Sequence, residues 1–193
     1  SAQNIVLYAS NAPVKVGNWA VVADSTAAGA YRLVNSDQGM SKIVTAAAAP
    51  SSYVELSFYA YAGQPYHLWM RGKADGDSPY NDSAHVQFSG SVTSTGSAIY
   101  RIGTTSSTEY NLEDCFACGL QGWGWQDNGW GVMGPDIYFQ VTGTQTIRIQ
   151  TREDGLSIDQ IVLSSNAYLF SSPGALKNDV VILSQNNGAP TPT

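Results

Sequence analysis

Apolar and polar side chains alternate along most of this chain, and a period of two residues is typical of half-buried β-strands. The clearest example is residues 53–61, where Val54, Leu56, Phe58 and Ala60 are separated by tyrosine, glutamate and serine. Helical periodicity is nearly absent. The pattern predicts strands at residues 4–8, 19–23, 53–61, 66–73, 84–89, 98–102, 137–141, 145–151, 156–164 and 180–183.

Turn residues join these segments, as in the tight hairpin signal Gly143-Thr144. Many short strands with such turns indicate an all-β fold, a two-layer antiparallel sandwich or barrel in which each strand buries one face. We expect one domain over residues 1–184. Residues 185–193 end in a run of proline and threonine that resembles the start of a linker. We therefore expect a tail there and a place for this domain in a longer polypeptide, as a monomer.

Composition narrows the classes of function. The chain has 193 residues and a formal net charge of −6, and charged residues make up 12%, about half the usual quarter. The 9 lysines and arginines are scattered singly, which excludes the basic stripe of a nucleic-acid binder. A hydrophobic content of 43% excludes disorder, and no apolar run reaches the roughly 18 residues of a membrane span. An uncharged polar surface predicts a secreted protein with a neutral, hydroxylated partner.

Residues 109–135 lack a strand pattern and are too long for an ordinary connection. Three of the five tryptophans lie there between glycines, which leave the indole faces uncovered. An indole can cover the apolar C–H face of a sugar ring, while Asp, Asn and Gln side chains pair with its hydroxyl groups. The alternative, a core position with a satisfied indole N–H, applies most strongly to Trp125. The predicted sugar contacts of this loop are Trp123, Trp125, Trp130, Asp127 and Asn128.

A second polar stretch, residues 73–83, contains the carboxylates of Asp75, Asp77 and Asp82. Calcium prefers such clusters of oxygen atoms. The stretch lacks the glycine and the closing glutamate of an EF-hand loop, so an EF-hand is excluded. A less regular calcium site and a plain polar turn both remain open. Tyr80, Asn81 and Asp82 are further candidates for contact with a sugar.

Two strand faces carry unexpected polar residues. His67, Trp69 and Arg71 share one face of residues 66–73, and His85 and Gln87 share one face of residues 84–89. These residues are candidates for lining a groove on a sheet face, which would be a second ligand site. A sheet surface that simply faces solvent explains them equally well.

The sequence offers little support for catalysis. The two histidines have no nucleophile motif nearby, and the Gly-x-Ser-x-Gly elbow and phosphate-binding glycine motifs are absent. Acidic loop residues such as Glu153 and Asp154 leave a glycosidase pair open. Cys115 and Cys118 are too few for a structural zinc site. We expect them to form a short disulfide at the base of the tryptophan-rich loop, which implies an oxidising compartment.

Three strings occur in order along the chain: residues 81–87, which read NDSAHVQ, residues 122–125, which read GWGW, and residues 146–163, which read TIRIQTREDGLSIDQIVL. Together they resemble the galactose-binding-like jelly-roll carbohydrate-binding modules of families six and thirty-five. The similarity spans roughly residues 4–164. It implies a β-sandwich that binds glycans without catalysis, through loops at one end of the sandwich.

The resemblance also implies a structural calcium ion, bound in part by the aspartate of the last motif, here Asp159. Those families often carry a glutamate in the first strand that helps to hold the ion, whereas this chain has no glutamate in residues 7–12. The candidate metal ligands are Asp75, Asp77 and Asp159.

Taken together, these patterns predict a secreted, two-sheet antiparallel β-sandwich (jelly roll) that binds a polysaccharide or oligosaccharide without catalysis. Two alternatives remain. One is a polysaccharide lyase or hydrolase on a sandwich scaffold, and the other is an adhesion module whose partner is a protein.

Overall fold

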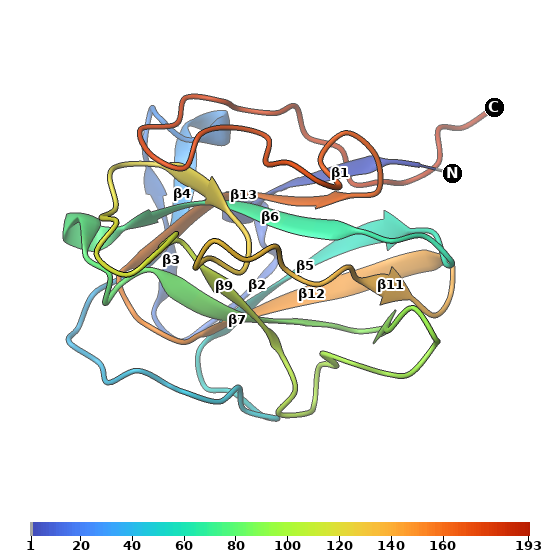
Figure 1. The fold of residues 1–193 in the computed structure, drawn as a ribbon, viewed down its shortest axis with the longest axis horizontal. Helices are drawn as coiled ribbons and strands as arrows, with labels where there is room; N and C mark the ends of the chain where they lie inside the picture. Colours follow the sequence, from blue (N-terminus) through green and yellow to red (C-terminus); the bar gives the residue numbers. More distant parts are fainter. Residues whose placement is uncertain (1) are drawn as a thin grey trace.

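Two antiparallel β-sheets stacked face to face form the body of the protein (Figure 1). The computed structural model describes residues 2–193. The first sheet has the order β10-β6-β13-β4-β3, with β1 paired to β13. Its strands are β1 (Asn4–Tyr8), β3 (Trp19–Ala23), β4 (Tyr31–Asn35), β6 (His67–Ala74), β10 (Gly124–Gln126) and β13 (Leu156–Ser164).

The second sheet has the order β2-β5-β12-β7-β9, and a two-stranded ribbon, β11-β8, lies beside it. Within residues 2–193 the only helices are single 3₁₀ turns, and none of them could cross a membrane. The predicted all-β, two-sheet antiparallel sandwich is therefore confirmed. The remaining elements are β2 (Val14–Val16), β5 (Tyr53–Ala60), β7 (Ser83–Phe88), β8 (Ser91–Val92), β9 (Thr108–Asn111), β11 (Tyr138–Phe139), β12 (Gly143–Thr151), η1 (Ala9–Asn11), η2 (Ala28–Ala30) and η3 (Asp75–Asp77).

The core lies between the two sheets, where the alternating pattern placed it. All four apolar residues of β5 that alternate with polar ones are buried. Phe58 packs edge-to-face against Phe88 and Phe139, with ring centroids 6.4 and 5.4 Å away. Edge-to-face contacts suit the charge distribution of aromatic rings, and this cluster joins the ribbon β11-β8 to the second sheet.

The polar face of β6 is covered by the chain itself, so the interpretation as a solvent-facing surface is wrong. Of its three polar residues, only Arg71 borders a hollow of about 510 Å³. His67, Trp69 and Arg71 are each at most 5% exposed. The segment after β13 lies over this face, and the indole N–H of Trp69 donates to the carbonyl of Tyr168 at 2.7 Å. We call residues 165–188 the C-terminal cover.

A loop covers the outer face of the second sheet in the same way. A ring nitrogen of His85 lies 2.7 Å from the carbonyl oxygen of Ile43, and the side chain of Gln150 pairs with the backbone of Ala47. His85 is buried as a result. Gln87 is buried under a different segment, because its side-chain amide donates to the carbonyls of Thr104 and Ser106. Residues 36–50 and the segment around Thr104 thus cover these two side chains, so neither a solvent-facing surface nor a groove lined by them is present.

Several strand predictions need correction. Residues 98–102 form isolated bridges rather than a strand, and residues 180–183 belong to the C-terminal cover. Conversely, β10 lies inside the stretch expected to lack strands and pairs with β6. A side chain at Gly124 would collide with the carbonyl oxygen of Leu176. Glycine is therefore needed where the C-terminal cover crosses β10.

The two ends of the chain lie close together, at the end of the sandwich away from the η3 turn (Figure 1). Val6 and Asn186 exchange two backbone hydrogen bonds of 2.7 and 2.9 Å. The side-chain amide of Gln3 also donates to the carbonyl of Gly188 at 3.0 Å. The packed part of the chain therefore extends to Gly188, into the segment expected to be a tail.

Candidate functional site

A pocket of about 410 Å³ opens at one end of the second sheet. Strand β7 begins there, and strands β9 and β12 end there, because Ser83 pairs with Asn111 and Ala84 pairs with Thr151. The loops that follow or precede these strands supply the walls. The pocket therefore combines the two stretches that the sequence singled out, residues 73–83 and 109–135.

Three exposed aromatic side chains line this pocket: Tyr80, Phe116 and Trp130. They are 78%, 87% and 47% exposed. Large aromatic groups gathered on a surface are typical of a binding site rather than of folding, since each of them would gain by burial. Tyr80 and Trp130 were predicted from the sequence. Phe116 was not, because a single phenylalanine between two cysteines carries no pattern of its own.

The backbone around Trp130 explains why its indole faces outward. A Cβ at Gly129 would lie 2.6 Å from the carbonyl oxygen of Asn111, so only glycine fits between the two segments. Trp130 has a φ of 60°, a left-handed conformation that is rare for a bulky residue. The backbone N–H of Trp130 donates to the backbone carbonyl of Glu113 at 2.8 Å and holds the residue in this conformation. Strained residues of this kind cluster at binding sites.

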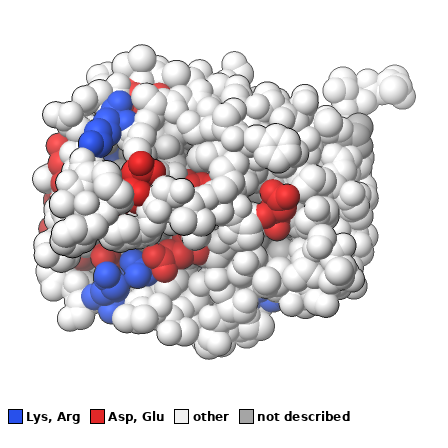
Figure 2. All heavy atoms as spheres, in the orientation of Figure 1, with Lys and Arg blue, Asp and Glu red and all other residues white. Residues whose placement is uncertain are grey.

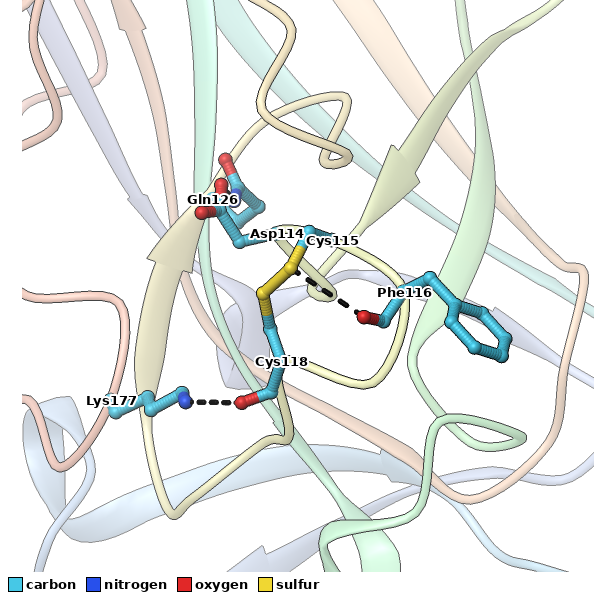
Figure 3. The surroundings of a disulfide bond; sticks show 6 residues. All are labelled: Asp114, Cys115, Phe116, Cys118, Gln126 and Lys177. Atoms are coloured by element: carbon cyan, nitrogen blue, oxygen red, sulfur yellow. Dashed lines mark hydrogen bonds between the residues drawn. A yellow bond between two sulfur atoms is a disulfide. The ribbon is translucent and has the colours of Figure 1, made fainter.

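The predicted disulfide between Cys115 and Cys118 is confirmed, and it closes a tight turn at the rim of the pocket. The N–H of Cys118 donates to the carbonyl of Cys115 at 3.1 Å. Lys177, from the C-terminal cover, donates to the carbonyl of Cys118 at 2.6 Å (Figure 3). Phe116 points away from the sulfur atoms, at the apex of this turn. The disulfide thus fixes where the third aromatic ring stands.

The polar side of the pocket is dominated by carboxyl groups. Ser83 donates to Glu153 at 2.8 Å. Burial, and then the neighbouring Glu153 and Glu113, raise the pKa of Asp82 to about 8. Burial works against ionisation of Glu153 as well, but hydrogen bonds from Asp82 and Ser83 lower its pKa. Asp82 therefore keeps its proton at neutral pH and shares it with the ionised Glu153.

Two basic residues border the same carboxyl groups. Lys42 lies 3.4 Å from Glu153, and Arg152 lies 3.2 Å from Glu109. Arg152 also donates to the hydroxyl of Ser83 at 2.7 Å. Figure 2 shows that most of the face it displays is uncharged, with a few separate acidic and basic groups. The expectation of a mostly uncharged polar surface agrees with this view.

Trp123 and Trp125 do not reach the pocket, and their predicted stacking role is not supported. They are 4% and 1% exposed. The indole N–H of Trp123 donates to the hydroxyl of Thr26 at 2.8 Å, and that of Trp125 donates to the carbonyl of Val181 at 3.3 Å. The core alternative is thus correct for both residues. The C-terminal cover and the segment around Thr26 pack over the indole faces that the neighbouring glycines leave uncovered.

Asn81, Asp127 and Asn128 also lie outside the pocket, whereas Asp82 lines it. The amide of Asn81 donates to the carbonyl of Asp75 at 3.0 Å and so closes its own loop. Asp127 is buried, which opposes its ionisation, yet its hydrogen bonds with His67 at 2.7 Å and the N–H of Gly134 lower its pKa. Asn81 and Asp127 hold loops in place, and their predicted contact with a ligand is not supported.

The three candidate calcium ligands do not form one site. Within residues 2–193, no group of three His, Cys, Asp or Glu side chains could hold a metal ion together. Asp77 accepts the N–H of Gly122 at 3.0 Å. Asp159 accepts a hydrogen bond of 2.6 Å from Arg71 and one of 2.7 Å from the N–H of Ala28. A guanidinium group already neutralises this buried carboxylate, so the residues present do not fit the calcium ion that the resemblance implies.

A second, larger hollow of about 580 Å³ lies beside η3 and is lined by Asp75 and Asp77. Arg32 and Lys73 contribute opposite charges to it. No aromatic side chain among the described residues lines it. It lacks the combination of ring faces and carboxyl groups that distinguishes the first pocket.

Comparison with known proteins supports the fold. No protein-family model matches this chain, and no curated protein matches it either. Among solved structures, a Podospora anserina GH26-CBM35 β-(1,4)-mannanase superposes with a TM-score of 0.51 at 14% sequence identity, over 85% of this chain and 28% of that one.

Two isolated modules give lower scores. A family 35 carbohydrate-binding module from Clostridium thermocellum has a TM-score of 0.43 at 13% identity, over 82% of this chain and 97% of its own length. The C-terminal CBM6 of LamC from Zobellia galactanivorans has a TM-score of 0.48 at 12% identity, over 84% of this chain and 99% of its own length. The superposition on the mannanase, with its TM-score of 0.51, confirms the resemblance seen in the sequence motifs at the level of the fold. This chain spans about a quarter of the mannanase's length.

Proposed function

We propose that this protein is a non-catalytic carbohydrate-binding module that holds a polysaccharide or oligosaccharide in the pocket between Tyr80, Phe116 and Trp130. The observation that carries the proposal is the joint presence of three exposed rings and several carboxyl groups around one cavity of about 410 Å³. Such a volume suits one or two sugar rings. The fold shared with a CBM35-containing mannanase adds support.

The chemistry of the pocket suits a sugar ring on both of its surfaces. A pyranose presents C–H groups on its faces and hydroxyl groups around its edge. The indole of Trp130 and the phenol of Tyr80 offer flat apolar surfaces for the C–H groups. Asp82, Glu113 and Asn111 offer hydrogen-bonding groups for the hydroxyl groups. In this proposal Trp130 and Tyr80 stack on the ring, and Phe116 covers its outer side.

We further propose that the protein acts outside the cell as a monomeric part of a larger carbohydrate-active or cell-surface protein. The Cys115–Cys118 disulfide supports an oxidising compartment. The GH26-CBM35 mannanase is an example of a chain that contains a CBM35 together with a catalytic domain.

A second candidate function, glycoside hydrolysis, is favoured by one observation: the pocket contains a protonated acid, Asp82, next to an ionised one, Glu153. Pairs of carboxyl groups with diverging pKa values are typical of glycosidases. In those enzymes, however, the two groups are about 5–9 Å apart, with the glycosidic bond between them. Asp82 and Glu153 share a hydrogen bond, which leaves no room for a substrate bond between them. Binding is therefore the better proposal.

A glycan array probed with and without EDTA tests the ligand class, and an assay for new reducing ends on the responsive polysaccharide tests catalysis. We expect retention on at least one glycan, equal signals with and without EDTA, and no new reducing ends. Trp130→Ala should abolish retention. Phe170→Ala, which removes an aromatic ring that is 82% exposed and lies outside the pocket, should not. Retention on no glycan, together with capture of a purified surface protein, would favour the adhesion module instead.

A further inference from the structure

The carboxyl groups of the pocket are not matched by the basic residues beside them. Four acidic residues line it, Asp82, Glu109, Glu113 and Glu153, against two basic ones. Arg152 pairs with Glu109, and Lys42 pairs with Glu153. Asp82 and Glu113 have no ion-pair partner among residues 2–193, although they are only 1% and 7% exposed.

Glu113 is the more informative of the two. Its side chain lines the pocket, and the hydrogen bonds that it forms within residues 2–193 involve only its backbone. Buried polar groups are nearly always paired, so an unpaired carboxylate in a pocket indicates a partner that the chain itself does not supply. Asp82 differs, because its buried Oδ2 atom has no donor in the chain and its carboxyl group shares a proton with Glu153. A donor for Glu113 must therefore come from the pocket side.

The aromatic walls point in the same direction as the unmatched acids. A cation is attracted to the face of an aromatic ring as well as to a carboxylate. Tyr80, Phe116 and Trp130 surround the opening above Asp82 and Glu113. A neutral sugar would use the rings but would leave Glu113 without a counter-charge, and a uronic acid would bring a like charge close to it.

We infer that the pocket selects a glycan that carries free amino groups, in which an ammonium group of a deacetylated hexosamine meets Asp82 and Glu113 while the ring stacks on Trp130. This inference rests on the proposed function and names the class of glycan. The ammonium supplies three N–H donors and one positive charge, which are the two properties that the inner end of the pocket lacks.

Proton release accompanies this binding. In the free protein a proton on Asp82 relieves its repulsion from Glu153 and Glu113. A bound ammonium takes over this role, because a positive charge nearby favours the ionised form of Asp82. At pH 6 most of the sugar amines are already charged, so each binding event should release up to one proton to the buffer. Lys42, Arg152, Glu109 and Tyr110 also face Asp82 or its carboxyl neighbours, and the first three keep their existing pairings.

The test is isothermal titration calorimetry at pH 6 with three matched tetrasaccharides: β-1,4-linked glucosamine, its N-acetylated form, and cellotetraose. We expect the glucosamine oligomer to bind about tenfold or more tightly than the other two, as for a hydrogen-bonded charged group. Its affinity should fall with added salt. Repeating the titration in buffers of different ionisation enthalpy should reveal the released proton.

Variants then assign the effect to the pocket. Glu113→Gln should remove most of the preference for the amine, whereas Glu55→Gln, which removes a carboxylate paired to Arg148 on the second sheet, should leave it unchanged. Thermal unfolding of each variant checks that it is folded. The salt and buffer measurements on the unmodified protein keep the test decisive if Glu113→Gln does not fold.

The outcomes separate this inference from the proposed function. If cellotetraose or the N-acetylated oligomer binds as tightly as the amine, the inference fails while the carbohydrate-binding function stands. If the amine is preferred but Glu113→Gln leaves the preference intact, the pocket is wrongly assigned. If no glycan on the array is retained, both proposals fail.

Discussion

The guanidinium of Arg71 lies 2.6 Å from one carboxylate oxygen of Asp159 and 2.7 Å from one of Asp179, and all three side chains are buried. Arg71 also donates to the carbonyls of Thr26 and Asp179, at 3.0 and 2.8 Å. One side chain thus connects β6, β13, the segment before η2 and the C-terminal cover. The motif that suggested a calcium ligand, Asp159, is instead held by a charge within the chain.

We therefore expect Arg71→Met to lower the free energy of unfolding by about 3–5 kcal/mol, because it leaves buried carboxylates without a counter-charge. Arg32→Met is a matched control, since Arg32 pairs with Asp24 near the surface and its loss should cost at most about 1 kcal/mol. Urea denaturation measures both. The melting temperature should be the same with and without EDTA. A drop that added calcium reverses would show that a metal ion contributes to this site after all.

The tryptophans should separate by function. Trp125→Ala removes a fully buried side chain and should cost about 3–5 kcal/mol of stability. Trp130→Ala removes a ring that is 47% exposed and should change stability by less than about 1 kcal/mol. Chemical denaturation and glycan retention, measured on the same samples, distinguish the two. Equal destabilisation by both variants would contradict the structure.

Reduction of the disulfide should affect binding more than folding. The Cys115–Cys118 bond closes a very short loop, for which chain entropy limits the stabilisation to about 2 kcal/mol. In the double variant Cys115→Ser/Cys118→Ser, Phe116 loses its fixed position at the rim, and we expect glycan affinity to fall several-fold. Calorimetric binding and thermal unfolding of the oxidised and double-variant proteins check this. Unchanged affinity would remove Phe116 from the site.

Stability should depend on pH through Asp82. Its pKa of about 8 in the folded protein lies above the value of about 3.9 for an aspartate in an unfolded chain. Between these pH values the folded state holds a proton on Asp82 that the unfolded state has lost. The stabilisation that this proton gives to the folded protein is therefore complete below about pH 4 and is lost as pH rises through about 8. The limiting slope is about 1.4 kcal/mol per pH unit.

Urea denaturation from pH 5 to pH 9 measures this slope. Asp82→Asn should flatten the curve over that range, since asparagine does not titrate. The lowered pKa of Glu153 acts in the opposite sense and only in acid, where its contribution is lost as pH falls. A profile of the unmodified protein that is flat between pH 6 and pH 8 would contradict the shared proton.

The sequence predicts correctly those features whose determining residues lie close together along the chain. The alternation in β5 identifies its buried face correctly, because the whole pattern lies within one strand. For Trp123 and Trp125 the sequence favours contact with a sugar and leaves a core position open, because their glycine neighbours leave the rings uncovered. What covers them is the C-terminal cover and the segment around Thr26, which lie far away in sequence and have no periodic pattern.

The pocket was only partly predictable for the same reason, because distant segments of the chain form it. Tyr80, Asp82 and Trp130 stood out through their local sequence, but Glu113 and Glu153 become part of the site only because β7, β9 and β12 share one end. Arg71 likewise carries no local sign of its two carboxylate partners, which lie 88 and 108 residues away. Strand order, rather than composition, assembles these groups.

The pairing of Val6 with Asn186 brings both ends of the chain to the end of the sandwich away from η3 and the neighbouring pocket (Figure 1). An affinity tag, a fluorophore or a solid support attached at either end would leave the opening to the sugar unobstructed. The protein can therefore be immobilised through Ala2 or Thr193, the ends of the described chain, for surface-based binding measurements, and the pocket will face the solution in both orientations.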